Sequence, residues 1–591
     1  MKKFLIIVSA FVLVVVSVAG LAFLNRQELL RMREGLPQFT SKPGKTDEVM
    51  IKMRDGVRLS TVIYHPKAPG PHPAILVRSP YADVAAFLSD SICGRLVRYS
   101  YICIFQDTRG QGGSEGEFAP GRNEIEDGSD TLHWIAEQSF HDGNLAMVGP
   151  SYLGGVQWAA AAGGLPPEVK TLVPAVYSPN SRDVMYQDGM FRHETFTAWA
   201  ARMHAGNRTS EEAGRQYQAS IRHRPHITAD EEIFGARLDW YREMIESTSP
   251  SAPYWSDPDN ARVMAAPEAM TVPILMVGGY YDVFFGPQFE DWQRLATRSE
   301  SKFIVGPWTH IGMGGEALDN PNSGGGLFQW KVMLPWLEHH LRGAAQSVEP
   351  GLSIYVMRKG EWQESQVWPE DGARSRLFLG GGANAASCTG GSLSDQVETP
   401  TAVSYTYDPD QPVPTRGGAG MLAFILPGFD GAPGANQWQD GLCERSDVLS
   451  FLGNELAEPV TISGKISVTL RVASSAPDTS FTAKLIEVLP DGRAMNIRDS
   501  ITTLKYRNGA ETERPYVPGE EVDITLDFWP IAWQVQEGSR LRLDISSSDF
   551  PKYHAHPNHA EPWAEVGSVQ VATQTIIVGE DSYMELPLAV Y

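Results

Sequence analysis

Residues 145–155 read Leu-Ala-Met-Val-Gly-Pro-Ser-Tyr-Leu-Gly-Gly, and this stretch decides the fold. Its first four residues form an apolar run that is typical of a buried strand, and a helix is expected to begin near Tyr152. Ser151 then lies on a sharp strand-to-helix turn, which projects its hydroxyl from the end of the strand. The amide of Tyr152 can face a developing oxyanion. The usual Gly-x-Ser-x-Gly pattern is not met, because Leu153 holds the fifth position.

An acid and a base follow two later apolar runs. Asp282 comes directly after residues 274–281, and His310 comes directly after residues 303–309. Open α/β sheets place their catalytic groups at the carboxyl ends of strands. The order Ser, Asp, His is the one expected of an α/β-hydrolase, so Ser151, Asp282 and His310 are the candidate catalytic residues.

Short apolar runs alternate with helical patterns over most of the first 370 residues, which predicts a mostly parallel sheet with helices on both faces. A hairpin over residues 49–64 opens the body of the chain around Asp55-Gly56. Residues 177–262 contain helical patterns without buried strands and are interpreted as an inserted cap. The expected strands are residues 74–77, 101–105, 145–148, 171–173, 273–277, 303–305 and 353–357.

The helical patterns stop near residue 371, and short strands separated by turn signals continue to the C-terminus. This predicts an all-β sandwich after the α/β-hydrolase fold. The expected divisions are 1–24 for a membrane anchor or signal peptide, 25–45 for a linker, 46–176 and 263–370 for the hydrolase, 177–262 for the cap, and 371–591 for the β domain.

Composition restricts the classes of function. The chain has 591 residues, of which 42% are hydrophobic and 20% charged, so it can form several globular units. Its formal net charge of -22 disfavours nucleic acid as a partner. The four cysteines, Cys93, Cys103, Cys388 and Cys443, show no zinc-site spacing. Cys388 can pair with Cys443 in an exported protein, and ordinary buried thiols are the alternative.

The N-terminal segment predicts export of the rest of the chain. Residues 4–24 contain no charge and follow Lys2 and Lys3, which predicts a cytoplasmic start and an external body. The length favours a retained single-helix anchor. The small residues Ser17, Val18 and Ala19 offer a cleavage site, so a periplasmic or secreted protein stays open.

At this point the chain resembles the family of the cocaine esterases, the α-amino acid ester hydrolases and the X-Pro dipeptidyl-peptidases. The resemblance runs from about residue 49 to the C-terminus. It rests on Arg78-Ser-Pro-Tyr81, Asp107-Thr-Arg-Gly-Gln-Gly-Gly-Ser-Glu-Gly116, Asp142-Gly-Asn, Gly149-Pro-Ser-Tyr-Leu-Gly154, Tyr281-Asp282, Gly306-Pro-Trp-Thr-His310 and Ser547-Ser-Asp-Phe-Pro551.

The resemblance implies a serine hydrolase that needs no cofactor or metal. Ser151 would attack an acyl carbonyl, His310 would shuttle the proton, and Asp282 would orient His310. The oxyanion hole would combine the hydroxyl of Tyr81 with the amide of Tyr152. The C-terminal domain would be a jelly roll, and the helical cap would cover the acyl pocket.

The expected substrate is a small ester with an apolar or aromatic acyl group, bound by Phe284, Phe285 and Trp199. The amino acid ester hydrolases place carboxylates soon after the catalytic aspartate, where this chain has phenylalanines. A short peptide cleaved by X-Pro dipeptidyl-peptidase activity is the alternative, for which Asp183 or Asp188 could hold the amine. An inactive surface protein that binds carbohydrate is a second alternative, and the sequence leaves a homodimer open.

A histidine-rich segment near the C-terminus contains His554, His556 and His559. A metal site is one interpretation of these three residues. We expect a solvated loop instead, because prolines interrupt the segment and the proposed hydrolysis needs no metal.

Overall fold

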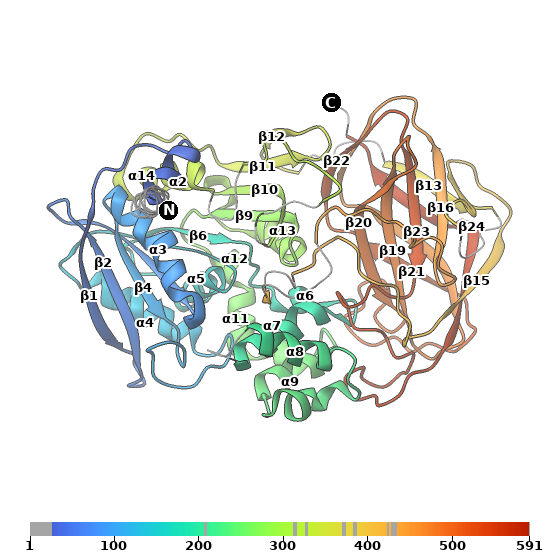
Figure 1. Cartoon of the computed structure of the whole chain (residues 1–591), viewed down its shortest axis with the longest axis horizontal. Coiled ribbons are helices and arrows are strands. Elements are labelled where there is room, and N and C mark those ends of the chain that lie inside the picture. The colour runs from blue at the N-terminus through green and yellow to red at the C-terminus, as the bar shows by residue number, and fades with distance from the viewer. Residues whose placement is uncertain are drawn as a thin grey trace, which may run out of the picture.

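The computed structural model describes residues 26–205, 210–310, 312, 316–324, 329–368, 374–381, 387–421, 425–426 and 434–589. Figure 1 shows an α/β unit at one side, an all-β unit at the other, and the cap helices between and below them. This is the predicted fold class. The expected anchor at residues 1–24 lies outside the described residues.

The first sheet has ten strands in the order β1-β2-β4-β3-β5-β6-β9-β10-β11-β12. Strands from β4 to β11 in this order run parallel, and antiparallel neighbours flank them at both edges. All seven strands expected from apolar runs form here. The bounds are β1 (Pro43–Lys52), β2 (Arg58–Pro66), β3 (His72–Ser79), β4 (Ile102–Asp107), β5 (His141–Pro150), β6 (Val169–Ala175), β9 (Leu275–Tyr281), β10 (Lys302–Thr309), β11 (Gly351–Val356) and β12 (Glu361–Ser365).

Helices cover both faces of this sheet. Alternate residues of β3 belong to different cores: Leu76 packs with α4 and α5, and Ile75 packs with α3 and α14. Burial on both faces explains why the central strands are continuous apolar runs. The helices of this unit are α3 (Ala85–Leu96), α4 (Glu124–Ala136), α5 (Tyr152–Gly163), α11 (Pro258–Met264), α12 (Ala266–Ala269), α13 (Phe285–Arg294) and α14 (Trp330–Arg342), with short 3-10 turns Ala82–Val84, Val97–Tyr99 and Arg298–Glu300.

The cap connects β6 to α11 and has a core of its own, which includes Phe191, Tyr217 and Tyr241. A two-stranded hairpin precedes its long helices. Its elements are α6 (Ser181–Met185), β7 (Tyr186–Gln187), β8 (Met190–Phe191), α7 (His193–Ala205), α8 (Ser210–Ser220), a 3-10 turn (His226–Thr228), a π-helical turn (Asp230–Phe234), α9 (Asp239–Glu246) and α10 (Pro253–Ser256).

The C-terminal unit is rich in strands, as predicted, and its description as a jelly roll stays a prediction. Its large sheet runs β20-β19-β23-β16-β14-β13-β24-β18-β21, with β15 paired to β24, and β17 and β22 form a second pair. The strands are β13 (Arg374–Gly380), β14 (Gly391–Ser394), β15 (Thr401–Tyr407), β16 (Leu449–Glu455), β17 (Val460–Gly464), β18 (Ser467–Ser474), β19 (Ser480–Val488), β20 (Ala494–Thr503), β21 (Val522–Asp527), β22 (Ile531–Val535), β23 (Arg540–Ser546) and β24 (Ala572–Pro587).

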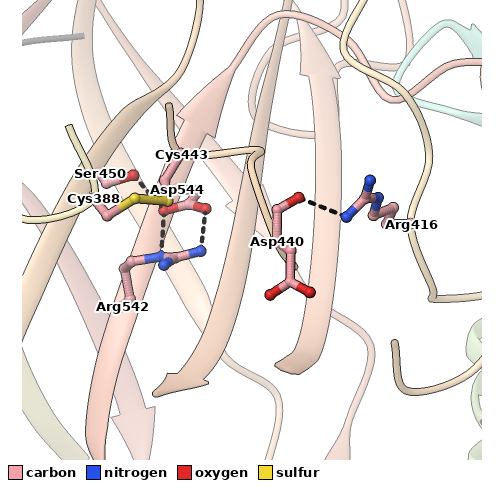
Figure 2. The surroundings of a disulfide bond; sticks show 7 residues. All are labelled: Cys388, Arg416, Asp440, Cys443, Ser450, Arg542 and Asp544. Atoms are coloured by element: carbon pink, nitrogen blue, oxygen red, sulfur yellow. Dashed lines mark hydrogen bonds and ion pairs between the residues drawn. A yellow bond between two sulfur atoms is a disulfide. The ribbon is translucent and has the colours of Figure 1, made fainter. Parts of the chain in front are cut away.

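All four cysteines are paired. Cys388 bonds to Cys443, which is the first of the two interpretations given above. Cys93 bonds to Cys103, which the sequence did not indicate. Figure 2 shows the Cys388–Cys443 bond beside Asp544, which accepts a hydrogen bond from Ser450 at 2.6 Å and pairs with Arg542.

The N-terminal segment is more ordered than a linker. Helix α2 (Arg26–Arg33) packs beside α3, where Gln27 donates a hydrogen bond to the Asp90 carbonyl at 2.9 Å. Within residues 26–589, as far as the structure describes them, no helix is long and apolar enough to cross a bilayer.

Candidate active site

The turn between β5 and α5 holds Ser151 in a backbone conformation with a positive φ of 58° and a ψ of −132°. Such a conformation is costly for a non-glycine residue and marks functional turns. Gly149 is needed beside it, because a Cβ there would lie 2.4 Å from the Cβ of Leu153. A Cβ on Gly155 would lie 2.6 Å from the ring of Tyr177. Small residues therefore let the turn close, although their spacing departs from the usual pattern.

A buried glutamine, which sequence reasoning missed, holds this turn from behind. The Gln157 amide donates to the carbonyls of Gly149, Leu153 and Val173 at 3.0–3.3 Å. Its oxygen accepts the Val173 N–H at 2.9 Å. These bonds tie the start of α5 to β5 and β6, and so fix the direction in which the serine projects.

Asp282 and His310 meet at the carboxyl ends of β9 and β10. The Nδ1 atom of His310 lies 3.1 Å from Oδ1 of Asp282 and 3.2 Å from Oδ2. Both side chains are buried, and the N–H of Phe284 donates to Oδ1 at 3.1 Å. A carboxylate in this position sets the tautomer of the ring and leaves Nε2 to act on a nucleophile.

The C-terminal unit clamps the strand that leads to Asp282. The Tyr281 hydroxyl donates to the Ile497 carbonyl at 3.1 Å and accepts from Asn436 at 2.7 Å. The guanidinium of Arg498 donates to the carbonyls of Tyr280 and Pro530. Residues from two units thus position the acid of the candidate triad.

Ser151 opens into a cavity between the sheet and the cap. Its lining is mostly apolar and aromatic, and Glu124 is the acidic residue among the described residues that form it. Both predicted carboxylates of the cap, Asp183 and Asp188, lie outside this lining. Asp183 pairs with Arg182 at 2.8 Å, and burial raises the pKa of Asp188 to about 7.

Tyr81 lies next to the candidate nucleophile. Burial raises the pKa of its phenol, and the Arg202 guanidinium together with hydrogen bonds to Trp199 and Ser151 partly offsets this effect. The phenol therefore stays protonated and can donate to an oxyanion. Tyr152 begins α5, where the N–H of the first residue has no partner within the helix.

The predicted acyl-binding residues divide between two places. Phe284 lines the cavity, stacks on Tyr177 with ring centroids 5.0 Å apart, and contacts the His310 ring. Trp199 also lines the cavity. Phe285 instead packs under Arg498 and beside Tyr280, away from the cavity lining. The prediction places two adjacent side chains in one pocket, but they begin a helix, where neighbours diverge by about 100°.

A second group of histidines, separate from His310, lies between the cap and the C-terminal unit. His554 stacks on Trp563 at 4.2 Å, and His226 lies 5.2 Å from the same ring. His554 and His556 are buried, so the expectation of a solvated loop was wrong: aromatic packing draws this segment inward. Among the described residues, no cluster of three or more His, Cys, Asp or Glu side chains could hold a metal.

Comparison with known proteins identifies the family. Residues 55–312 match the X-Pro dipeptidyl-peptidase family profile (S15 family), and residues 345–584 match its C-terminal non-catalytic domain. Cocaine esterase from Rhodococcus sp. (strain MB1 Bresler) is 32% identical over 86% of this chain and 92% of its own. The chain belongs to the family of the cocaine esterases and X-Pro dipeptidyl-peptidases. It is therefore a serine hydrolase, as predicted.

Solved structures agree on the fold. An α-amino acid ester hydrolase superposes with a TM-score of 0.76 at 23% identity, covering 94% of this chain and 98% of its own. An aminopeptidase from a marine sediment Thaumarchaeota archaeon gives a TM-score of 0.76 at 22% identity, with the same coverage. Both carry a similar arrangement of the hydrolase and β-rich units over nearly their whole length.

Proposed function

We propose that this family member cleaves esters with an apolar or aromatic acyl group through a Ser151–His310–Asp282 triad and an acyl-enzyme. The observation that carries this proposal is the position of Ser151, on a strained turn (φ 58°) that opens into the mostly apolar cavity. The Asp282–His310 pair at neighbouring strand ends supports it.

The chemistry follows from these positions. His310 takes the Ser151 proton as the hydroxyl oxygen attacks the acyl carbon, and Asp282 stabilises the imidazolium that forms. The Tyr81 hydroxyl and the Tyr152 N–H donate to the carbonyl oxygen as it becomes negative. His310 then protonates the alcohol as its bond to the acyl carbon breaks, which leaves the acyl group on Ser151. In the second half, His310 takes a proton from water, the water oxygen attacks the acyl carbon, and His310 returns the proton to the Ser151 oxygen as the acid leaves.

Ester hydrolysis is favoured because the cavity offers no uncommitted anion for a substrate ammonium among its described residues. The Glu124 carboxylate already pairs with Arg78 at 2.8 Å and accepts from Tyr152 at 2.9 Å. Phe284, Trp199 and Tyr177 supply an apolar surface instead. An unpaired ammonium in such a site would lose its hydration without compensation.

X-Pro dipeptidyl-peptidase activity remains the second candidate, because the family profile carries that description. The test is to compare kcat/KM for aryl esters and for X-Pro anilides with one preparation of the protein. We expect aryl esters to be cleaved faster. Faster cleavage of the anilides would make the protein a peptidase.

We further propose that the body of the chain acts outside the cytoplasmic membrane. The uncharged residues 4–24 and the two disulfides support this location. A membrane-impermeant fluorophosphonate should label the protein in intact spheroplasts, and the intact mass of the labelled product distinguishes a retained anchor from a cleaved signal. Labelling only after lysis would contradict export.

A further inference from the structure

The oxyanion donors of the proposed site come from two different elements. Tyr81 follows the end of β3, whereas the Tyr152 amide begins α5. Both must lie within hydrogen-bond distance of one oxygen in the transition state, and an error of about 1 Å can cost roughly 100-fold in rate. Some interaction must therefore fix β3 relative to the start of α5.

A chain of buried polar contacts joins these two elements through Glu124 of α4. One carboxylate oxygen, Oε2, accepts from Nη1 of Arg78 at 2.8 Å, and the other, Oε1, accepts from the Tyr152 hydroxyl at 2.9 Å. Arg78 is fully buried and lies three residues before Tyr81, whose own N–H donates to Ser79 at 3.2 Å. The contacts therefore connect β3, which leads to Tyr81, with Tyr152, whose amide is the other donor.

Further contacts hold the side chains of Arg78 and Tyr152 in one orientation each. Arg78 also donates to Gln106 at 2.7 Å, and the Tyr152 hydroxyl accepts from the Gly121 N–H at 3.3 Å. The Tyr152 ring stacks on Trp199 with an interplanar angle of 20°. A side chain restrained at its hydroxyl and its ring also restrains its own backbone N–H.

We propose that Glu124 is a positioning residue, which holds the Tyr81 hydroxyl and the Tyr152 amide at the spacing that the oxyanion requires. This inference rests on the proposed function. A buried ion pair contributes little net stability, because desolvation offsets the attraction between the charges. Its benefit here is geometric, since a carboxylate can accept from a guanidinium and a phenol at once.

Two variants interrupt this series of polar contacts at different points. Tyr152→Phe removes the hydroxyl and leaves the backbone amide, and Glu124→Gln removes the charge. We expect each to lower kcat for an aryl ester about tenfold or more, with KM within about threefold. The affinity for an aryl boronic acid should fall in parallel, because its adduct on Ser151 mimics the tetrahedral intermediate. The double variant should be no slower than the slower single variant.

Matched controls remove similar groups elsewhere. Tyr186→Phe deletes a buried hydroxyl that donates to the carbonyls of Met244 and Ile245. Glu487→Gln neutralises a buried carboxylate that pairs with Arg358 at 3.3 Å and accepts from Trp533 at 2.8 Å. Both controls should keep the wild-type kcat and boronate affinity, even if their melting temperatures fall as far as those of the test variants.

The outcomes separate the inference from the function beneath it. Wild type that neither reacts with a fluorophosphonate nor cleaves esters contradicts the proposed function, and the positioning role with it. Reactive wild type with unchanged kcat and boronate affinity in Tyr152→Phe contradicts the positioning role alone. If Glu124→Gln does not fold, because the buried charge of Arg78 loses the carboxylate that pairs with it, Tyr152→Phe still decides the question.

Discussion

His310 and the second group of buried histidines, which includes His193, His226 and His554, have different neighbours. His310 faces the carboxylate of Asp282 at 3.1 Å, and its ring lies 5.4 Å from that of Phe284, which lines the same cavity as Ser151. His193 instead contacts the Thr197 hydroxyl at 2.8 Å and the Ile221 carbonyl at 3.1 Å, and the His226 ring lies 4.6 Å away. The first arrangement suits proton transfer, whereas the second suits packing.

Electrostatics reinforce this difference. Burial lowers the pKa of His193 to about 4 and holds the pKa values of His226 and His554 well below their ordinary range. Neighbouring histidines disfavour the charged forms of His226 and His554 further. A histidine becomes a useful base when a carboxylate stabilises its charged form, and burial without one produces a neutral structural residue.

The largest expected effect comes from removing the carboxylate that faces the ring of His310. Asp282→Asn should lower kcat for an aryl ester by about 10⁴-fold, because the amide no longer selects the required His310 tautomer. Steady-state kinetics at neutral pH measure this loss. Activity within tenfold of wild type would mean that another residue orients His310.

A smaller effect is expected at the oxyanion. Tyr81→Phe should lower kcat by roughly 100-fold or more, the cost of losing one donor to the developing charge. KM should change little, since the phenyl ring still fills its place at the cavity. Wild-type turnover in this variant would remove Tyr81 from the site.

Replacement of a histidine in the second group should change the stability of the fold rather than turnover. A histidine with a depressed pKa in the folded state stabilises the fold above its unfolded pKa of about 6.5, and that stability is lost as pH falls toward about 4. For His193 the upper limit is about 3 kcal/mol. His193→Gln should keep kcat at neutral pH and flatten the decline of the melting temperature between pH 6.5 and 4. Parallel curves for variant and wild type would assign the acid sensitivity to other groups.

Several features could be predicted from sequence because they depend on local pattern. Apolar runs identify the strands of the first sheet, since burial on both faces requires continuous apolar residues. The ends of those runs predict Ser151, Asp282 and His310 as candidate catalytic residues, and the family resemblance implies Tyr81 as the second oxyanion donor. Fold class and family followed from the same stretches.

Features that depend on long-range packing could not be predicted. Neither the Glu124 contacts nor the Gln157 bonds have a local signature, because their partners lie on other strands and helices. The divergence of Phe285 from Phe284 requires the start of α13 to be known to the residue. The burial of His554 depends on Trp563 and on cap residues more than 300 positions earlier in the chain, such as Phe191, whose N–H donates to its ring at 3.1 Å.

The central claim is that Ser151 is an activated nucleophile, and intact-protein mass after fluorophosphonate treatment tests it most directly. Wild type should gain the mass of one adduct, and Ser151→Ala should gain none. His193→Gln should react like wild type, because the histidine that it replaces belongs to the second group and not to the proposed triad. A folded wild type without an adduct, or an adduct that persists in Ser151→Ala, would contradict the account.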